Sequence, residues 1–139
     1  MFIRACILVA GFEVLAAYAT LAIAQVDPTK VLIGRWEGRI EGNKRGSNQP
    51  TLVIRSVEPT ETGWVAERRV QGAYHKDVEV SIKDGLIVLE YKSSQHDPYR
   101  LVLTGDNRLE GALYYAQYKG SGIRMHTYRV SFEKTQSKR

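Results

Sequence analysis

The chain has 139 residues, a formal net charge of +5 and a sequence pI near 9.4. This length fits one domain, and the basic balance favours weak attraction to anionic surfaces. The basic residues form pairs such as Lys44-Arg45 and Arg68-Arg69 rather than runs, so no nucleic-acid partner is expected. The chain holds a single cysteine, Cys6, which excludes an internal disulfide.

The first 24 residues differ in composition from the rest of the chain. Arg4 precedes a stretch of small and apolar residues that ends in Ala22-Ile23-Ala24, a small-residue cleavage pattern. Residues 1–24 therefore predict a signal peptide and a periplasmic or secreted protein. Glu13 within the apolar stretch disfavours a permanent transmembrane helix, and no membrane span is expected after cleavage. A retained N-terminal anchor is the alternative. Residues 25–30 are interpreted as a short polar lead-in.

The first predicted strand covers 31–41. Side chains of a strand alternate between its two faces, so Trp36, Gly38 and Ile40 are expected on the inner face. The outer face would carry charges of alternating sign: Arg35, Glu37, Arg39 and Glu41. We expect Trp36 to anchor the core, with Gly38 leaving room for a large neighbour such as the indole.

Seven further segments alternate like strands and are separated by turn residues. Asp84-Gly85 fits a two-residue hairpin turn and predicts Ile82 opposite Ile87, Glu79 opposite Glu90 and Val78 opposite Tyr91. These segments are 51–57, 64–70, 77–83, 86–92, 99–104, 108–118 and 123–133, followed by a charged tail at 134–139. The predicted fold is all-β, an eight-stranded antiparallel up-and-down meander barrel, because closure removes both sheet edges.

The domain at 31–133 resembles the lipocalin-like barrels of the calycin superfamily, including bacterial lipocalin-like domains. The resemblance lies in Gly34-Arg35-Trp36, a G-x-W on the first strand, together with a late arginine, Arg129 or Arg124. It implies that the arginine packs over Trp36 and that the barrel binds a small ligand. The chain departs from classical lipocalins in lacking a disulfide and a predicted C-terminal helix.

No constellation for catalysis is visible in the sequence. His75 and His96 lie in predicted turns and His126 on the last strand, and none has a partner at metal-ligand spacing. The sequence shows no Ser-His-Asp grouping and no glycine-rich phosphate loop. We therefore expect a protein that is not an enzyme and that uses neither metal nor cofactor.

Several polar and aromatic side chains are expected to face the barrel interior, where they could bind a ligand. Arg68 could pair with a ligand carboxylate or phosphate, or could lie at the open end and extend into water. The candidate ligand-binding residues are Trp64, Arg68, Tyr91, Tyr99, His126 and Tyr128; the structural ones are Trp36, Gly34, Gly38 and Arg129.

Two functions stay open at this point. The first is an exported barrel that binds a small hydrophobic or amphipathic molecule in its interior. The alternative is an envelope accessory or inhibitor protein with a filled barrel that binds another protein through loops such as 43–50. The volume of the interior separates them. A hollow favours a ligand, and an interior packed by Trp36, Trp64, Ile82, Leu89 and Phe132 favours a protein partner.

Overall fold

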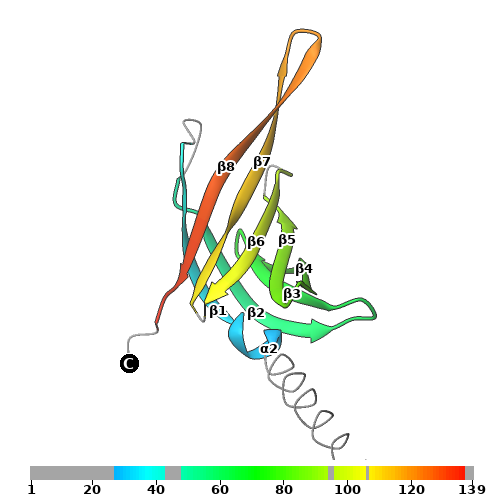
Figure 1. The fold of residues 1–139 in the computed structure, drawn as a ribbon. Coiled ribbons are helices and arrows are strands. Elements are labelled where there is room, and N and C mark those ends of the chain that lie inside the picture. Colours follow the sequence, from blue (N-terminus) through cyan, green and yellow to red (C-terminus); the bar gives the residue numbers. More distant parts are fainter. Residues whose placement is uncertain (1–26, 43–47, 94–95, 106, 137–139) are drawn as a thin grey trace, which may run out of the picture.

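A computed structural model describes residues 27–42, 48–93, 96–105 and 107–136, and shows one barrel (Figure 1). The predicted signal peptide and most of loop 43–50 lie outside these residues. Among the described residues, no helix is long and apolar enough to cross a bilayer. The elements are α2 (Pro28–Val31), β1 (Gly34–Ile40), β2 (Thr51–Pro59), β3 (Trp64–Val70), β4 (Ala73–Lys83), β5 (Leu86–Lys92), β6 (Pro98–Gly105), β7 (Arg108–Lys119) and β8 (Gly122–Lys134).

The eight strands form a closed antiparallel barrel in sequence order, with β8 returning to pair with β1. This confirms the predicted meander. The β4–β5 hairpin has the predicted register, with Ile82 opposite Ile87, and both Asp84 and Gly85 adopt positive φ. A turn with two positive φ values matches the right-handed twist of the strands that it joins.

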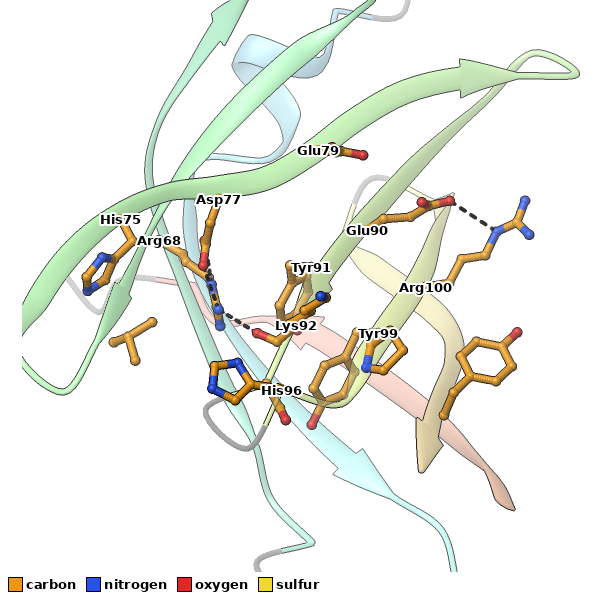
Figure 2. A pocket seen from close by; sticks show the side chains of 14 residues that line it. Arg68, His75, Asp77, Glu79, Glu90, Tyr91, Lys92, His96, Tyr99 and Arg100 are labelled. Atoms are coloured by element: carbon orange, nitrogen blue, oxygen red, sulfur yellow. Dashed lines mark hydrogen bonds and ion pairs between the residues drawn. The ribbon is translucent and has the colours of Figure 1, made fainter. Parts of the chain in front are cut away.

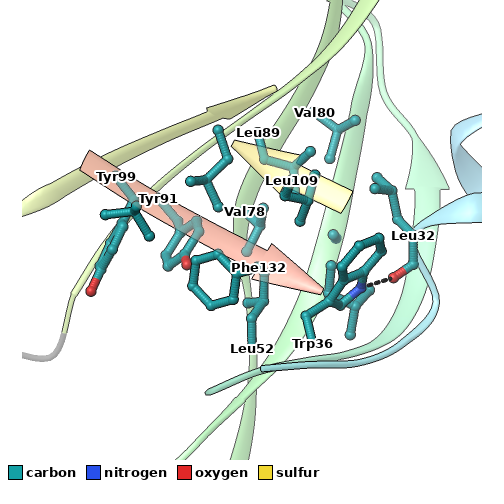
Figure 3. Packing of buried hydrophobic residues seen from close by; sticks show 14 of the residues in the cluster. Leu32, Trp36, Leu52, Val78, Val80, Leu89, Tyr91, Tyr99, Leu109 and Phe132 are labelled. Carbon is teal, nitrogen blue, oxygen red and sulfur yellow. Dashed lines mark hydrogen bonds between the residues drawn. The ribbon is translucent and has the colours of Figure 1, made fainter. Parts of the chain in front are cut away.

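One end of the barrel is closed by α2, which replaces part of the predicted lead-in and the start of the predicted first strand. Asp27 caps this single turn, accepting hydrogen bonds from the amide and hydroxyl of Thr29, which hold the pKa of Asp27 below its ordinary value. The turn brings Leu32 under the barrel, where the indole Nε1 of Trp36 donates to the Leu32 carbonyl at 3.0 Å (Figure 3). Both side chains are fully buried, as predicted for Trp36.

Trp36 and Ile40 are buried on the inner face of β1, which confirms the predicted alternation. Gly38 lies between them and leaves space for a side chain of another strand. A Cβ at Gly38 would lie 2.6 Å from the ring of Phe132 on β8, so the large neighbour is this phenyl ring rather than the indole. The buried cluster around Trp36 and Phe132 fills this half of the barrel; its other members include Ile40, Leu52, Ile54, Val78, Val80, Leu89, Leu101, Leu109 and Val130.

The cation over Trp36 is a lysine and not the expected arginine. Lys134 places Nζ 5.4 Å from the centre of the indole ring and donates to the Val31 carbonyl at 2.8 Å. Gly34, at φ +141°, makes room for it, because a Cβ there would lie 2.7 Å from Lys134 Cε. Arg129 is exposed and lies on the outer-face phase of β8, since its neighbour Val130 points inward. The expectation that Arg129 packs over Trp36 was therefore wrong, because its side chain lies on the outer face of β8.

The start of the predicted tail is part of the barrel. The Lys134 amide donates to the Asn107 carbonyl, and the Thr135 amide donates to the Arg35 carbonyl, both at 2.9 Å. Residues 137–139 lie outside the described residues. Ile82 corrects the expected core, because it is 45% exposed near the β4–β5 turn, beyond the packed interior.

Candidate functional site

The second end of the barrel contains a cavity of about 750 Å³ (Figure 2). Its lining comes from the last residues of β3 and β5, the first part of β4 and β6, the β5–β6 loop and the middle of β7. The side chains are Arg68, Val70, His75, Asp77, Glu79, Glu90, Tyr91, Lys92, Ser93, His96, Pro98, Tyr99, Arg100 and Tyr114. This lining combines apolar and aromatic walls with a few polar groups, which is the usual composition of small-molecule sites.

The cavity lies where strands β4 and β5 separate. Their pairing ends at Glu79 opposite Glu90, so the predicted pair of Val78 with Tyr91 does not form. Glu79, Glu90 and Arg100 belong to the outer face, whereas Arg68 and Tyr91 point inward, and all five line the same cavity. The cavity therefore extends from the barrel mouth through the gap between β4 and β5.

Two β-bulges lie on either side of β3, and the one in β4 is close to the point where β4 leaves β5. In β2 the register shifts between Ile54 and Ser56, which leaves Arg55 as the extra residue. In β4 it shifts beside Glu67, which leaves Asp77 unpaired between Lys76 and Val78. A bulge bends its strand and redirects the side chain at the extra position.

Each bulge residue supplies the ionic partner of a β3 side chain. Arg55 binds the buried carboxylate of Glu67 and places its guanidinium 3.8 Å from the centre of the Tyr74 ring. Asp77 turns toward the interior and binds Arg68. Strict alternation along the predicted strand 77–83 would place Asp77 on the outer face, opposite to its neighbour Val78. This expectation is wrong because the bulge reverses the phase of β4 at Asp77.

Arg68 connects the two strands that separate. Its Nε and Nη2 donate to the two carboxylate oxygens of Asp77 at 2.7 and 2.8 Å, and Nη2 also donates to the Lys92 carbonyl on β5 at 2.6 Å. The guanidinium lies 4.7 Å from the centre of the Tyr91 ring, and the side chain is only 11% exposed. Arg68 therefore neither extends into water nor stands as an unneutralised cation; it bridges the gap in the wall.

Two stacked tyrosines separate the cavity from the packed interior. The rings of Tyr91 and Tyr99 lie 4.9 Å apart at 17°, and Tyr99 meets Phe132 edge-on at 6.5 Å (Figures 2 and 3). Burial raises the pKa of both tyrosines. The neighbouring Tyr99 raises that of Tyr91 further, and Asp97 that of Tyr99, while Arg68 offsets part of each shift. Both hydroxyls are therefore neutral and able to donate at physiological pH.

Charges at the outer part of the cavity largely balance one another. Glu90 faces Glu79 across the hairpin, the like-charge pair that the sequence predicted. Lys83 and Arg100 place nitrogens 3.6 and 3.7 Å from Glu90 Oε1 and relieve that repulsion. Among the described residues, no group of three or more histidine, cysteine and acidic side chains could hold a metal ion.

Of the six predicted ligand-binding residues, three line the cavity and three lie elsewhere. Arg68, Tyr91 and Tyr99 meet at the cavity. Trp64 and Tyr128 are partly buried and pack against the core cluster instead. His126 lies on the hairpin beyond the barrel, where it forms a hydrogen bond with Gln117 at 3.1 Å.

Sequence reasoning missed four lining residues that matter to the cavity. His75 was placed in a turn, but β4 begins at Ala73, and His75 pairs with Arg68 on the inner face. His96 was likewise placed in a predicted turn and given no binding role. Asp77 and Tyr114 were given no binding role. Gln71 and Gly72 both have positive φ and form a tight β3–β4 turn. The Gln71-Gly72 dipeptide was the sequence signal that could have placed the start of β4 at Ala73 instead of Asp77.

Searches against protein-family models, curated proteins and solved structures find no significant match to this chain. The closed eight-stranded barrel is compatible with a lipocalin-like fold. Membership of the calycin superfamily stays a prediction from the G-x-W on β1.

Proposed function

We propose that this chain is a non-enzymatic binding barrel that holds a small amphipathic molecule in the cavity of its open end. The observation that carries the proposal is the cavity itself, about 750 Å³ lined by the stacked Tyr91 and Tyr99 and by the Arg68–Asp77 pair. This volume lies within the range of small-molecule sites, roughly 300–1,000 Å³. Export is part of the proposal and rests on the signal-peptide pattern of residues 1–24.

The charges at the cavity favour a ligand with an uncharged polar group. Asp77 neutralises Arg68 through two hydrogen bonds, so a ligand carboxylate would compete with an anion already in place. A hydroxyl or amide can instead accept from the guanidinium edge and donate to the carboxylate without displacing either. The apolar part of the ligand would pack against Val70, Pro98 and the tyrosine edges.

A protein-binding role is the second candidate, favoured by the filled interior of the closed end. Trp36, Phe132 and Leu89 are all fully buried there, so this half of the barrel has no room for a ligand. The two roles differ in what happens when the cavity is blocked, because only the first requires the cavity to be empty.

Two fluorescent probes with one aromatic frame test the ligand class. N-Phenyl-1-naphthylamine is neutral, and 1-anilinonaphthalene-8-sulfonate adds a sulfonate to the same rings. We expect the neutral probe to bind more tightly, with saturable enhancement of its emission. Val70→Trp, which fills the cavity, should weaken it by about tenfold or more, equivalent to about 1.4 kcal/mol. Thr104→Trp, at an exposed β6 position away from the cavity, serves as the control.

Removing the carboxylate tests the electrostatic part of the proposal. Asp77→Asn leaves Arg68 without its anion, so the preference should shift toward the sulfonated probe. Glu58→Gln removes a comparably exposed carboxylate from the outer ion pair with Lys76 and should leave the preference unchanged. If the Val70→Trp protein bound each probe as tightly as the parent protein does, the cavity would not be the binding site.

A further inference from the structure

The β7–β8 hairpin continues well beyond the barrel wall (Figure 1). Pairing of β6 with β7 ends at Leu113, and pairing of β8 with β1 ends at Val130. From Tyr114 opposite Thr127 to Lys119 opposite Gly122, the two strands pair only with each other. We call residues 114–127 the ribbon. Its six paired positions span about 20 Å at the usual rise of a strand.

The ribbon reverses the usual arrangement of polar and apolar faces. In the barrel the inward phase is apolar, and on β7 it runs through the buried Leu113. Continued into the ribbon, that phase carries Tyr115 and Gln117, facing His126 and Arg124. The outward phase becomes the apolar one, with Tyr114, Ala116 and Tyr118 opposite Thr127, Met125 and Ile123.

Three side chains of this outward face are strongly exposed. Tyr118 is 78%, Ile123 62% and Met125 64% exposed, the highest values among the large hydrophobic side chains of the described residues. Tyr118 and Ile123 are cross-strand partners, and Met125 is two residues along β8 on the same face. They form one continuous apolar stripe at the tip, and such stripes on a soluble domain mark contact sites.

The charge of this segment has a single sign. Residues 111–132 contain no aspartate or glutamate, although the whole chain has 15, and they include Lys119, Arg124 and Arg129. The guanidinium groups of Arg124 and Arg129 belong to exposed residues. An apolar stripe with cations and no anions matches the interface of an anionic bilayer, where aromatic and aliphatic tips enter the headgroup region and cations meet lipid phosphates.

We propose that the ribbon docks the protein on an anionic phospholipid surface, with Tyr118, Ile123 and Met125 in the headgroup region. A stable protein interface takes roughly 20–30 residues a side, far more than this stripe offers. The absence of carboxylates suits lipid phosphates specifically. The ribbon rises from the same end as the cavity, and Tyr114 at its base also lines the cavity. Docking would therefore place the cavity mouth toward the lipid.

Vesicle flotation of the full chain tests this proposal. Vesicles of phosphatidylglycerol mixed with phosphatidylcholine should bind the protein, and pure phosphatidylcholine should bind it at least about tenfold less, with the difference shrinking as salt screens the charges. The triple variant Tyr118→Ser, Ile123→Ser, Met125→Ser should lose about tenfold or more of the anionic binding. Because every protein tested carries the same residues 1–26, a difference between variants belongs to the ribbon.

The β4–β5 hairpin offers a matched control. Ile82 and Leu86 are 45% and 49% exposed, and Ile82→Ser with Leu86→Ser should leave vesicle binding unchanged. Equal binding by the parent and the triple variant, or no preference for the anionic vesicles, would overturn the proposal. A loss of vesicle binding by the triple variant that is seen only when a protein partner is present would also overturn it, because the ribbon would then contact protein and not lipid.

A spectroscopic measurement covers the case in which the triple variant folds poorly. A nitrobenzoxadiazole label on Met125→Cys, in a Cys6→Ser background, should shift to the blue and brighten on anionic vesicles. The same label on Leu86→Cys should not. Identical emission at both positions would place the membrane contact elsewhere and contradict docking by the ribbon.

Discussion

The two ends of the barrel use different physical means to hold the same eight strands together. At the closed end, Trp36 and Phe132 are fully buried among aliphatic side chains, with one indole hydrogen bond to Leu32. At the open end, Arg68 and Asp77 bridge a gap between strands beside a cavity. Dense apolar packing stabilises the fold at one end, which leaves the other end able to keep polar groups and empty volume. Stability and binding should therefore respond to different substitutions.

Trp36→Ala should have the largest effect on stability. It removes a fully buried indole and its hydrogen bond, and large-to-small core changes of this kind cost about 3–5 kcal/mol. Tyr99→Ala at the open end should cost less, because the Tyr99 ring borders a cavity and is not packed on every side. Urea denaturation measures both. A smaller loss for Trp36→Ala than for Tyr99→Ala would break the comparison.

Gly38→Ala should come next, because the added methyl would overlap the ring of Phe132. Overpacking a core typically costs about 1–3 kcal/mol. Combining it with Phe132→Leu, which makes space, should cost less than the sum of the two single changes. Additive losses in denaturation experiments would show that the two positions do not share this contact.

The open end should lose stability in alkali, and Tyr91→Phe should reduce that loss. Burial raises the folded-state pKa of Tyr91, so above the unfolded value near 10 the unfolded chain binds fewer protons than the folded one. Stability is unaffected below about pH 10 and then falls by up to about 1.4 kcal/mol per pH unit for this tyrosine. Unfolding free energies across pH 9–11 measure the slope. An unchanged slope in Tyr91→Phe would place the alkaline sensitivity elsewhere.

Much of the fold could be predicted because strand alternation and turn chemistry are local. Trp36, Gly38 and Ile40 take the inner face as expected, and the Asp84-Gly85 turn alone set the register of β4 and β5. The lysine over Trp36 could not be predicted with the same tools. Whether Arg129 or Lys134 reaches the indole depends on how β8 aligns with β1, a contact between distant parts of the chain.

The candidate site was only partly predictable, for a definite physical reason. Arg68, Tyr91 and Tyr99 follow the inner phase of their strands and could be found by counting. Asp77 could not, because the bulge in β4 changes the phase there and depends on pairing with β3. Counting gives the face of a side chain but not its height along the barrel. Trp64 and Tyr128 pack against the core cluster, and His126 lies beyond the wall because β7 and β8 run past it.

The contact between β1 and β8 also bears on when the barrel can form. The Thr135 hydroxyl and the Arg35 carbonyl that it bonds are 100 residues apart in sequence. Pairings of such long range form late and slowly, because the intervening chain must be ordered before they give any stability. Since β8 follows every other strand, the nascent chain exposes the Trp36 face of β1 until β8 has been synthesised. The last step of folding therefore waits for β8, and the aggregation risk is concentrated in the interval before that step.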